Sequence, residues 1–205
     1  MPRMTPRVMW LTLLAPLMIL AAACGNTVPV GEWFFGQTLA INIQDLQRVQ
    51  ELRYTAEDKQ WVVRPTRDGY EIAAVQLSVR NRQAAVSILS IGKESLRMSD
   101  DKFLDYNAVD PFTQRMEVAA SADPIGGASP ILDKHVPFIW GPVDLPQQCF
   151  NTTTNVIEGC ELKGWVLFEI PKDVGVSQVV WETSDVIYIR FKDNKKPWWA
   201  FWRPA

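Results

Sequence analysis

The sequence has few of the residues on which hydrolytic and metal chemistry most often depends. Its 205 residues include one histidine, His135, and three cysteines. It contains no glycine pattern of a nucleophile elbow, no glycine-rich phosphate loop and no dinucleotide-binding fingerprint. Because a nucleophile, a base and an orienting group cannot be assembled from it, we expect a protein that is not an enzyme and that carries no cofactor.

Candidate metal ligands are equally sparse. His135 follows Asp133 and could ligate a metal with it, but a lone histidine more often has a surface or structural role. Asp100, Asp101 and Asp105 could gather around calcium, although their spacing does not match an EF-hand loop. We therefore predict a solvated turn at Asp100–Asp105 and no metal site.

Basic residues are too few and too dispersed for nucleic-acid binding. The chain has 21 lysines and arginines against 23 acidic residues. Only Arg3 and Arg7 are basic within the first 23 residues, so removal of that segment makes the net charge more negative. Since phosphate binding needs a concentrated basic surface, we exclude nucleic acid as a partner.

The first residues have the pattern of a secretion signal. Arg3 and Arg7 precede an apolar run over residues 8–20, and three alanines follow at 21–23. The run is too short for the roughly 20 residues of a membrane-spanning helix. Cys24 comes directly after the alanines and resembles the lipidated cysteine of a bacterial lipobox, although Ala21 is unusual there. We predict a lipoprotein signal peptide over 1–23, cleavage before Cys24 and an acyl anchor on Cys24; incidental placement of Cys24 is the alternative.

The other two cysteines are close enough in sequence to pair. In an oxidising compartment Cys149 and Cys160 can form a disulfide, and lipidation then accounts for the odd cysteine. A bridge over so short a loop would stabilise the fold by roughly 3 kcal/mol in the chain-entropy model. Two unpaired thiols are the alternative.

Alternating apolar residues predict an all-β domain. In Gly164–Pro171, Val166, Phe168 and Ile170 fall on one side of an extended chain, and this apolar side requires a second layer to cover it. Further strands are predicted at 39–43, 61–65, 70–80, 86–91, 95–98, 103–109, 179–183 and 187–192. Residues 45–57 suit either a helix or a continued strand, and we favour the strand. Many short strands without a long helix indicate an antiparallel β-sandwich.

The connection over residues 110–148 is unusually long. Six prolines and the pair Gly126-Gly127 exclude a long regular element from it. Long ordered loops are often functional, but a surface excursion pinned by its apolar residues is the alternative.

Two segments resemble a known family. Residues 70–81, an early strand that ends in asparagine, and residues 164–171, a late strand that ends Phe-Glu-Ile-Pro, resemble the uncharacterised immunoglobulin-like domain of bacterial secreted lipoproteins, which is similar in fold to a mycobacterial secreted antigen. The resemblance covers residues 36–192. It implies an immunoglobulin-like β-sandwich and brings no catalytic residues.

The C-terminal residues are rich in tryptophan, with lysines before them. They could fold onto the core, lie on a membrane, or contact a partner or stack on a glycan. We divide the chain into the signal at 1–23, a tether at 24–36, a sandwich at 37–194 that includes loop 110–148, and a tail at 195–205. The possible contact residues are Trp140, Trp165, Trp198, Trp199 and Trp202.

These features predict a membrane-tethered, extracytoplasmic interaction protein of the bacterial cell envelope, with another envelope protein as its possible partner. The alternative is an extracytoplasmic lipoprotein that binds a small ligand or carbohydrate, with exposed Trp140, Trp165 or Trp198 as stacking platforms. A ligand site should group tryptophans around a concavity, whereas a protein-contact surface should be flat or lie at an edge.

Overall fold

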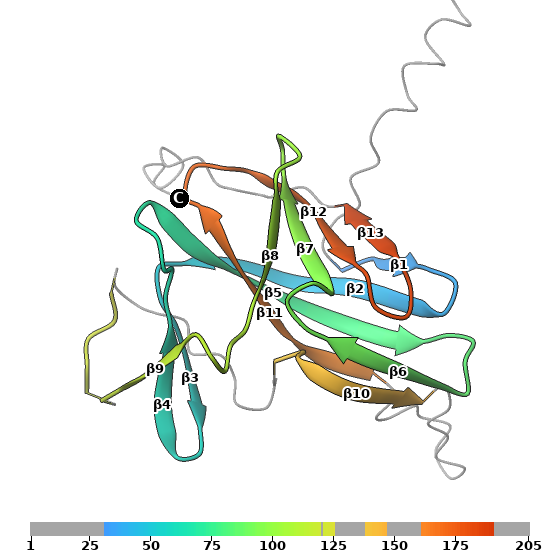
Figure 1. The fold of residues 1–205 in the computed structure, drawn as a ribbon, viewed down its shortest axis with the longest axis horizontal. Coiled ribbons are helices and arrows are strands. Elements are labelled where there is room, and N and C mark those ends of the chain that lie inside the picture. Colours follow the sequence, from blue (N-terminus) through green and yellow to red (C-terminus); the bar gives the residue numbers. More distant parts are fainter. Residues whose placement is uncertain (1–30, 120, 126–137, 147–160, 191–205) are drawn as a thin grey trace, which may run out of the picture.

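The computed structural model describes residues 31–119, 121–125, 138–146 and 161–190. Within these ranges the chain is all-β and forms an antiparallel β-sandwich, which confirms the predicted fold class (Figure 1). The strands are β1 (Trp33–Phe35), β2 (Leu39–Val49), β3 (Leu52–Ala56), β4 (Lys59–Val63), β5 (Tyr70–Asn81), β6 (Val86–Ile91), β7 (Leu96–Asp100), β8 (Asp105–Val109), β9 (Arg115–Val118), β10 (Gly141–Pro146), β11 (Glu161–Pro171), β12 (Val176–Trp181) and β13 (Ile187–Arg190).

The centre of the fold is the long antiparallel pair β5 and β11. The two strands are in register from Glu161 opposite Arg80 to Pro171 opposite Tyr70, and β2 pairs with the other edge of β5. The ambiguous residues 45–57 belong to β2 and to β3, so the strand prediction is correct there.

The predicted alternation of β11 is confirmed, and both of its faces are covered. Val166, Phe168 and Ile170 enter the main core, which also receives residues of β6, β7, β10, β12 and β13. On the opposite face, Trp165 and Leu167 pack in a second core beneath the small sheet β3-β4-β9. Burial of both faces fixes the register of β11, because a slip by one residue would move every side chain to the other face.

Strand β8 links the two layers of the sandwich. Its Ala108 and Val109 pair with β11, whereas its first three residues pair with β7. The large sheet therefore has the order β1-β2-β5-β11-β8-β7-β12-β13 and folds over the main core. Beyond their two paired rows β8 and β11 diverge, which is visible where the two strands cross in Figure 1.

The long connection 110–148 contributes two short strands. Its β9 extends the small sheet by pairing with β4, and its β10 pairs with β6. No long element occurs in the described part of this stretch, as its prolines predict.

Several turns that join strands of the large sheet gather at two opposite ends of the sandwich. One end, here called the Phe103 end, carries turns 67–69, 101–104 and 172–175, which are joined by backbone bonds from Lys172 to Gly69 and from Asp101 to Gly175. The other, the Phe35 end, carries turns 36–38, 82–85 and 182–186, where Arg82 N–H donates to Thr38 O. The strands run between these two ends of the sandwich. Strand register therefore determines which end carries each turn.

Candidate functional site

The Phe35 end carries a groove bordered by exposed apolar side chains. The groove has a volume of 810 Å³ and lies between β1 and the β12–β13 turn. Phe35 is 67% exposed and Val186 is 56% exposed, and both line it. Ile88 on β6 is 70% exposed and adjoins the same turn, because Ser184 Oγ donates to Ile88 O at 2.8 Å. Two strands, β1 and β6, and the β12–β13 turn thus place apolar side chains near one open surface.

Asp185 holds this surface in place. Its Oδ2 accepts the backbone N–H of Thr38 at 2.8 Å and of Leu39 at 3.1 Å, which ties the β12–β13 turn to the start of β2. Gly36 makes the close approach possible, since a Cβ at that position would lie 2.2 Å from Asp185 Oδ2. Backbone N–H groups bond more strongly to a carboxylate than to a neutral acceptor. The two bonds of Asp185 therefore hold the β12–β13 turn, which lines the groove, in a fixed position.

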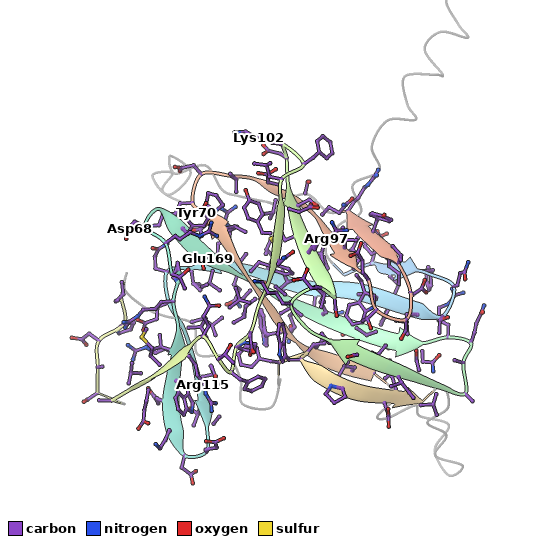
Figure 2. All side chains as sticks on the ribbon, viewed as in Figure 1. Asp68, Tyr70, Arg97, Lys102, Arg115 and Glu169 are labelled. Atoms are coloured by element: carbon purple, nitrogen blue, oxygen red, sulfur yellow. The ribbon has the colours of Figure 1, made fainter. Side chains whose placement is uncertain are left out.

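A second apolar surface lies at the Phe103 end. Phe103 is 87% exposed and Leu104 is 58% exposed, at the tip of the β7–β8 turn. Figure 2 shows Lys102 at the same tip, well above the strands. Phe103 has a φ of 63°, in the left-handed region that glycine or asparagine usually occupies. For another residue this conformation costs about 1–2 kcal/mol, so the turn keeps an exposed ring despite an unfavourable backbone.

The β7–β8 turn is held by Asp100, which is fully buried. Asp100 Oδ1 accepts the backbone N–H groups of Lys102 and Leu104, each at 2.8 Å, and Oδ2 accepts the hydroxyl of Tyr106 at 3.0 Å. Burial opposes ionisation of Asp100, but the bonds from Leu104, Lys102 and Tyr106 outweigh it and lower the pKa of Asp100. The turn is therefore rigid before any contact is made.

A second concave feature is the polar groove where β8 diverges from β11. Its volume is 680 Å³, and its lining among the described residues includes no tryptophan. Glu169 forms part of its wall and is held by the backbone N–H groups of Thr66 and Arg67, at 3.1 and 3.0 Å. The guanidinium of Arg67 stacks 3.8 Å from the ring centroid of Tyr70. Figure 2 shows Asp68, Tyr70 and Glu169 grouped on this side of the fold.

Tryptophan does not provide the exposed platform that was expected on β11. Trp165 is only 5% exposed and belongs to the second core, so the expectation that it forms a contact surface is wrong. It is buried because the β3-β4-β9 sheet covers this face of β11. Trp140 is half-buried and packs against the main core.

Several predicted site residues lie outside the described ranges, so their predictions stay untested. Among the described residues, no group of three or more His, Cys, Asp or Glu could hold a metal, and no helix is long and apolar enough to cross a membrane. Asp100, expected in a solvated turn, is instead buried, whereas Asp101 is exposed. The residues outside are Cys24, Asp133, His135, Cys149, Cys160, Trp198, Trp199 and Trp202.

The two apolar surfaces were missed at the level of sequence. Residues 103–109 were predicted as one strand, but β8 begins at Asp105 and leaves Phe103 and Leu104 in the turn. The available signal was their position directly after Asp100-Asp101-Lys102, a polar run typical of a turn.

Two solved structures are distantly similar to this chain. No family model and no curated protein matches the sequence. Among solved structures, the chain is similar to the secreted protein MPT63 of Mycobacterium tuberculosis, with 12% identity and a TM-score of 0.41, over 83% of this chain and 99% of that one. It is also similar to an uncharacterised β-sandwich protein of Clostridium difficile 630, with 10% identity and a TM-score of 0.34, over 77% and 87% of the two chains. At these values the likeness carries no argument about the fold or the function of this chain, and membership of a lipoprotein family stays a prediction.

Proposed function

We propose that the protein is a non-enzymatic, lipid-anchored component of the bacterial cell envelope that contacts an envelope protein through the Phe35 end of its sandwich. The observation that carries this proposal is the exposed apolar surface of Phe35, Ile88 and Val186, at the end of the fold from which β1, followed toward its N-terminus, leads away. Anchoring through Cys24 leaves that surface directed away from the membrane.

The chemistry of the Phe35 end suits a protein partner. Soluble domains seldom expose large apolar side chains together, and such patches often mark interaction sites. Here Phe35 and Val186 border a groove whose rim carries Glu182 and Asp185, so an apolar centre has a polar border. The groove is also held in shape by the bonds of Asp185, which reduces the entropy lost on binding.

Photo-crosslinking in cells tests the contact. A benzophenone amino acid at position 35 or 88 should capture the same discrete partner, and Val186→Lys should abolish that capture by placing a charge in the interface. The matched control is position 55, where Thr55 is exposed on β3 outside this surface. Equal capture from position 55, or none from 35 and 88, contradicts the proposed contact.

The anchor has a separate test. Cys24→Ser should release the protein from the membrane fraction, because a single serine cannot carry the acyl chains that hold it there. Retention of that variant in a carbonate-washed membrane pellet contradicts lipid as the sole anchor.

A second candidate function is binding of a small polar ligand in the groove between β8 and β11. Its volume lies in the usual range for ligand sites, and its lining is rich in hydrogen-bonding groups. If this function holds, titration with oligosaccharides shifts the NMR signals of the groove, and Asn107→Ala abolishes the shift. These lining groups include Thr66, Arg67, Asp105, Asn107, Asp110 and Gln114.

A further inference from the structure

We propose that the Phe103 end of the sandwich rests on the bilayer, with Phe103 and Leu104 seated among the lipid headgroups and upper acyl chains. The inference rests on the proposed anchor at Cys24. It adds a second, protein-borne membrane contact that orients the domain.

Strand β1, followed toward its N-terminus, leads away from the Phe35 end. In β1, Phe35 lies opposite Ala40 and Trp33 lies opposite Asn42, so the chain toward the N-terminus runs along β2 toward the end of β2 at Val49. Gly31 is level with Ile43, to which it is hydrogen-bonded. Followed toward the N-terminus, residues 35–31 therefore lead toward the Phe103 end.

The length of the tether agrees with this orientation. Gly31 lies seven positions after Cys24, and seven residue steps span at most about 25 Å. The part of β2 from Ile43 to Val49 is about 20 Å long at the usual rise of a strand. An acyl anchor on Cys24 can thus reach the level of the Phe103 end, but it cannot pass far beyond it. A domain anchored so closely must bring that end near the lipid.

The Phe103 end presents two apolar side chains on a fixed backbone. Phe103 and Leu104 are adjacent and exposed, and their backbone is fixed by the buried carboxylate of Asp100. A rigid turn with two apolar side chains at its tip offers a small wedge to the interfacial region, where aromatic side chains are favourably placed. In water, the exposed ring of Phe103 contributes no favourable free energy of burial.

The charges at this end determine the kind of lipid contact. The three turns carry as many acidic as basic residues, so no strong attraction to anionic lipid is expected. Apolar insertion must supply the contact, and it should be insensitive to lipid charge. The charged residues are Arg67, Asp68, Asp101, Lys102, Lys172 and Asp173.

The experiment uses the mature acylated protein in vesicles. We would replace Phe103 with p-benzoyl-L-phenylalanine and irradiate the protein in vesicles of phosphatidylcholine alone and of phosphatidylcholine mixed with phosphatidylglycerol. Phe35 is the matched control, because it is also an exposed phenylalanine but lies at the opposite end. We expect roughly tenfold more lipid adduct from position 103 than from position 35, in both kinds of vesicle, since only one ring is buried against acyl chains.

The outcomes separate this inference from the proposed function. Intact mass of the protein shows whether Cys24 is acylated. With acylation present, equal labelling at 103 and 35, or a crosslink from 103 to a second copy of the chain, overturns the bilayer contact and leaves the anchor standing. A mature protein without acyl chains overturns the anchor, and the orientation falls with it. Adduct only in the vesicles with phosphatidylglycerol overturns the apolar mode of contact.

Discussion

The hydroxyl of Tyr106 donates to Asp100 Oδ2 at 3.0 Å, and this bond joins the first strand residues of β8 to the end of β7. Burial of the phenol, together with the bond to the Asp100 carboxylate, raises the pKa of Tyr106 to about 12. The pair therefore links the shape of the exposed β7–β8 turn to pH.

Alkaline pH should weaken the fold through Tyr106. An unfolded tyrosine ionises near pH 10, so stability from the neutral hydroxyl is fully present below pH 10 and is lost as pH rises toward about 12. Tyr106→Phe removes one hydrogen bond, at a cost of about 1 kcal/mol at neutral pH, and should flatten this alkaline loss. Urea unfolding of both proteins between pH 8 and 12 measures this loss of stability. An unchanged alkaline slope in the variant contradicts the assignment.

Acid should act on the same turn through Asp100. Its pKa is lowered in the fold, so its stabilisation is present above the unfolded value near 4 and is lost as pH falls through the lower folded pKa. Asp100→Asn should cost about 2 kcal/mol at neutral pH, because an ionised acceptor of two N–H groups is lost, and it should reduce the acid dependence. Asp101→Asn is the control, since Asp101 is exposed; equal losses from both changes contradict the prediction.

Loss of one partner from the buried network around Glu51 should lower the free energy of unfolding far more than loss of one partner from a surface ion pair. Glu51 binds Arg53 and Arg64, each at 2.6 Å. Burial opposes ionisation of Glu51, but the bonds from Arg53 and Arg64 outweigh it and lower its pKa. Glu51→Gln should cost about 3–5 kcal/mol, because it leaves the buried charge of Arg53 poorly compensated.

The matched control for that change is an exposed pair. Lys59 and Glu117 lie 2.8 Å apart with both side chains about half exposed. Glu117→Gln should cost less than about 1 kcal/mol, since water screens exposed pairs. Denaturant midpoints of the two variants give the comparison, and similar losses would show that the Glu51 network is not energetically special.

The sequence predicts the strands of this fold better than it predicts what covers them. Alternation along Gly164–Pro171 assigns Trp165 and Val166 to opposite faces of β11, and the structure agrees. It does not reveal that Trp165 is covered, because the cover includes Phe138, which comes from the proline-rich stretch 110–148 and forms an isolated bridge with Trp165. The rest of the cover comes from β3 and β4, which are far from β11 in sequence.

The same reasoning explains why the exposed apolar surfaces were missed. Apolar residues such as Phe103 or Ile88 are counted toward a core when only the sequence is read. Their exposure follows from where a strand begins or which face of β6 is covered, and those are properties of the assembled sheet.

The burial of Trp165 leads to a clear stability difference between two tryptophans. Trp165→Ala should cost about 3–5 kcal/mol, as expected for removal of a large buried side chain. Trp140→Ala should cost less, because Trp140 is only half-buried. Equilibrium unfolding in urea, followed by circular dichroism, measures both. A Trp165→Ala protein as stable as the unsubstituted one would restore Trp165 as an exposed contact residue.

The strained backbone of Phe103 separates folding from membrane contact. Phe103→Gly removes both the ring and the strain at φ 63°, whereas Phe103→Ala removes the ring and keeps the strain. The glycine variant should therefore be more stable than the alanine variant by about 1 kcal/mol, despite the greater freedom of its unfolded chain. Thermal unfolding provides the measurement. Both variants should lose the contact of this turn with vesicles equally, because that contact depends on the ring. Lipid binding by the ring would explain why a phenylalanine that lowers stability occupies an exposed turn. An alanine variant more stable than the glycine variant would show that the backbone at position 103 is not strained.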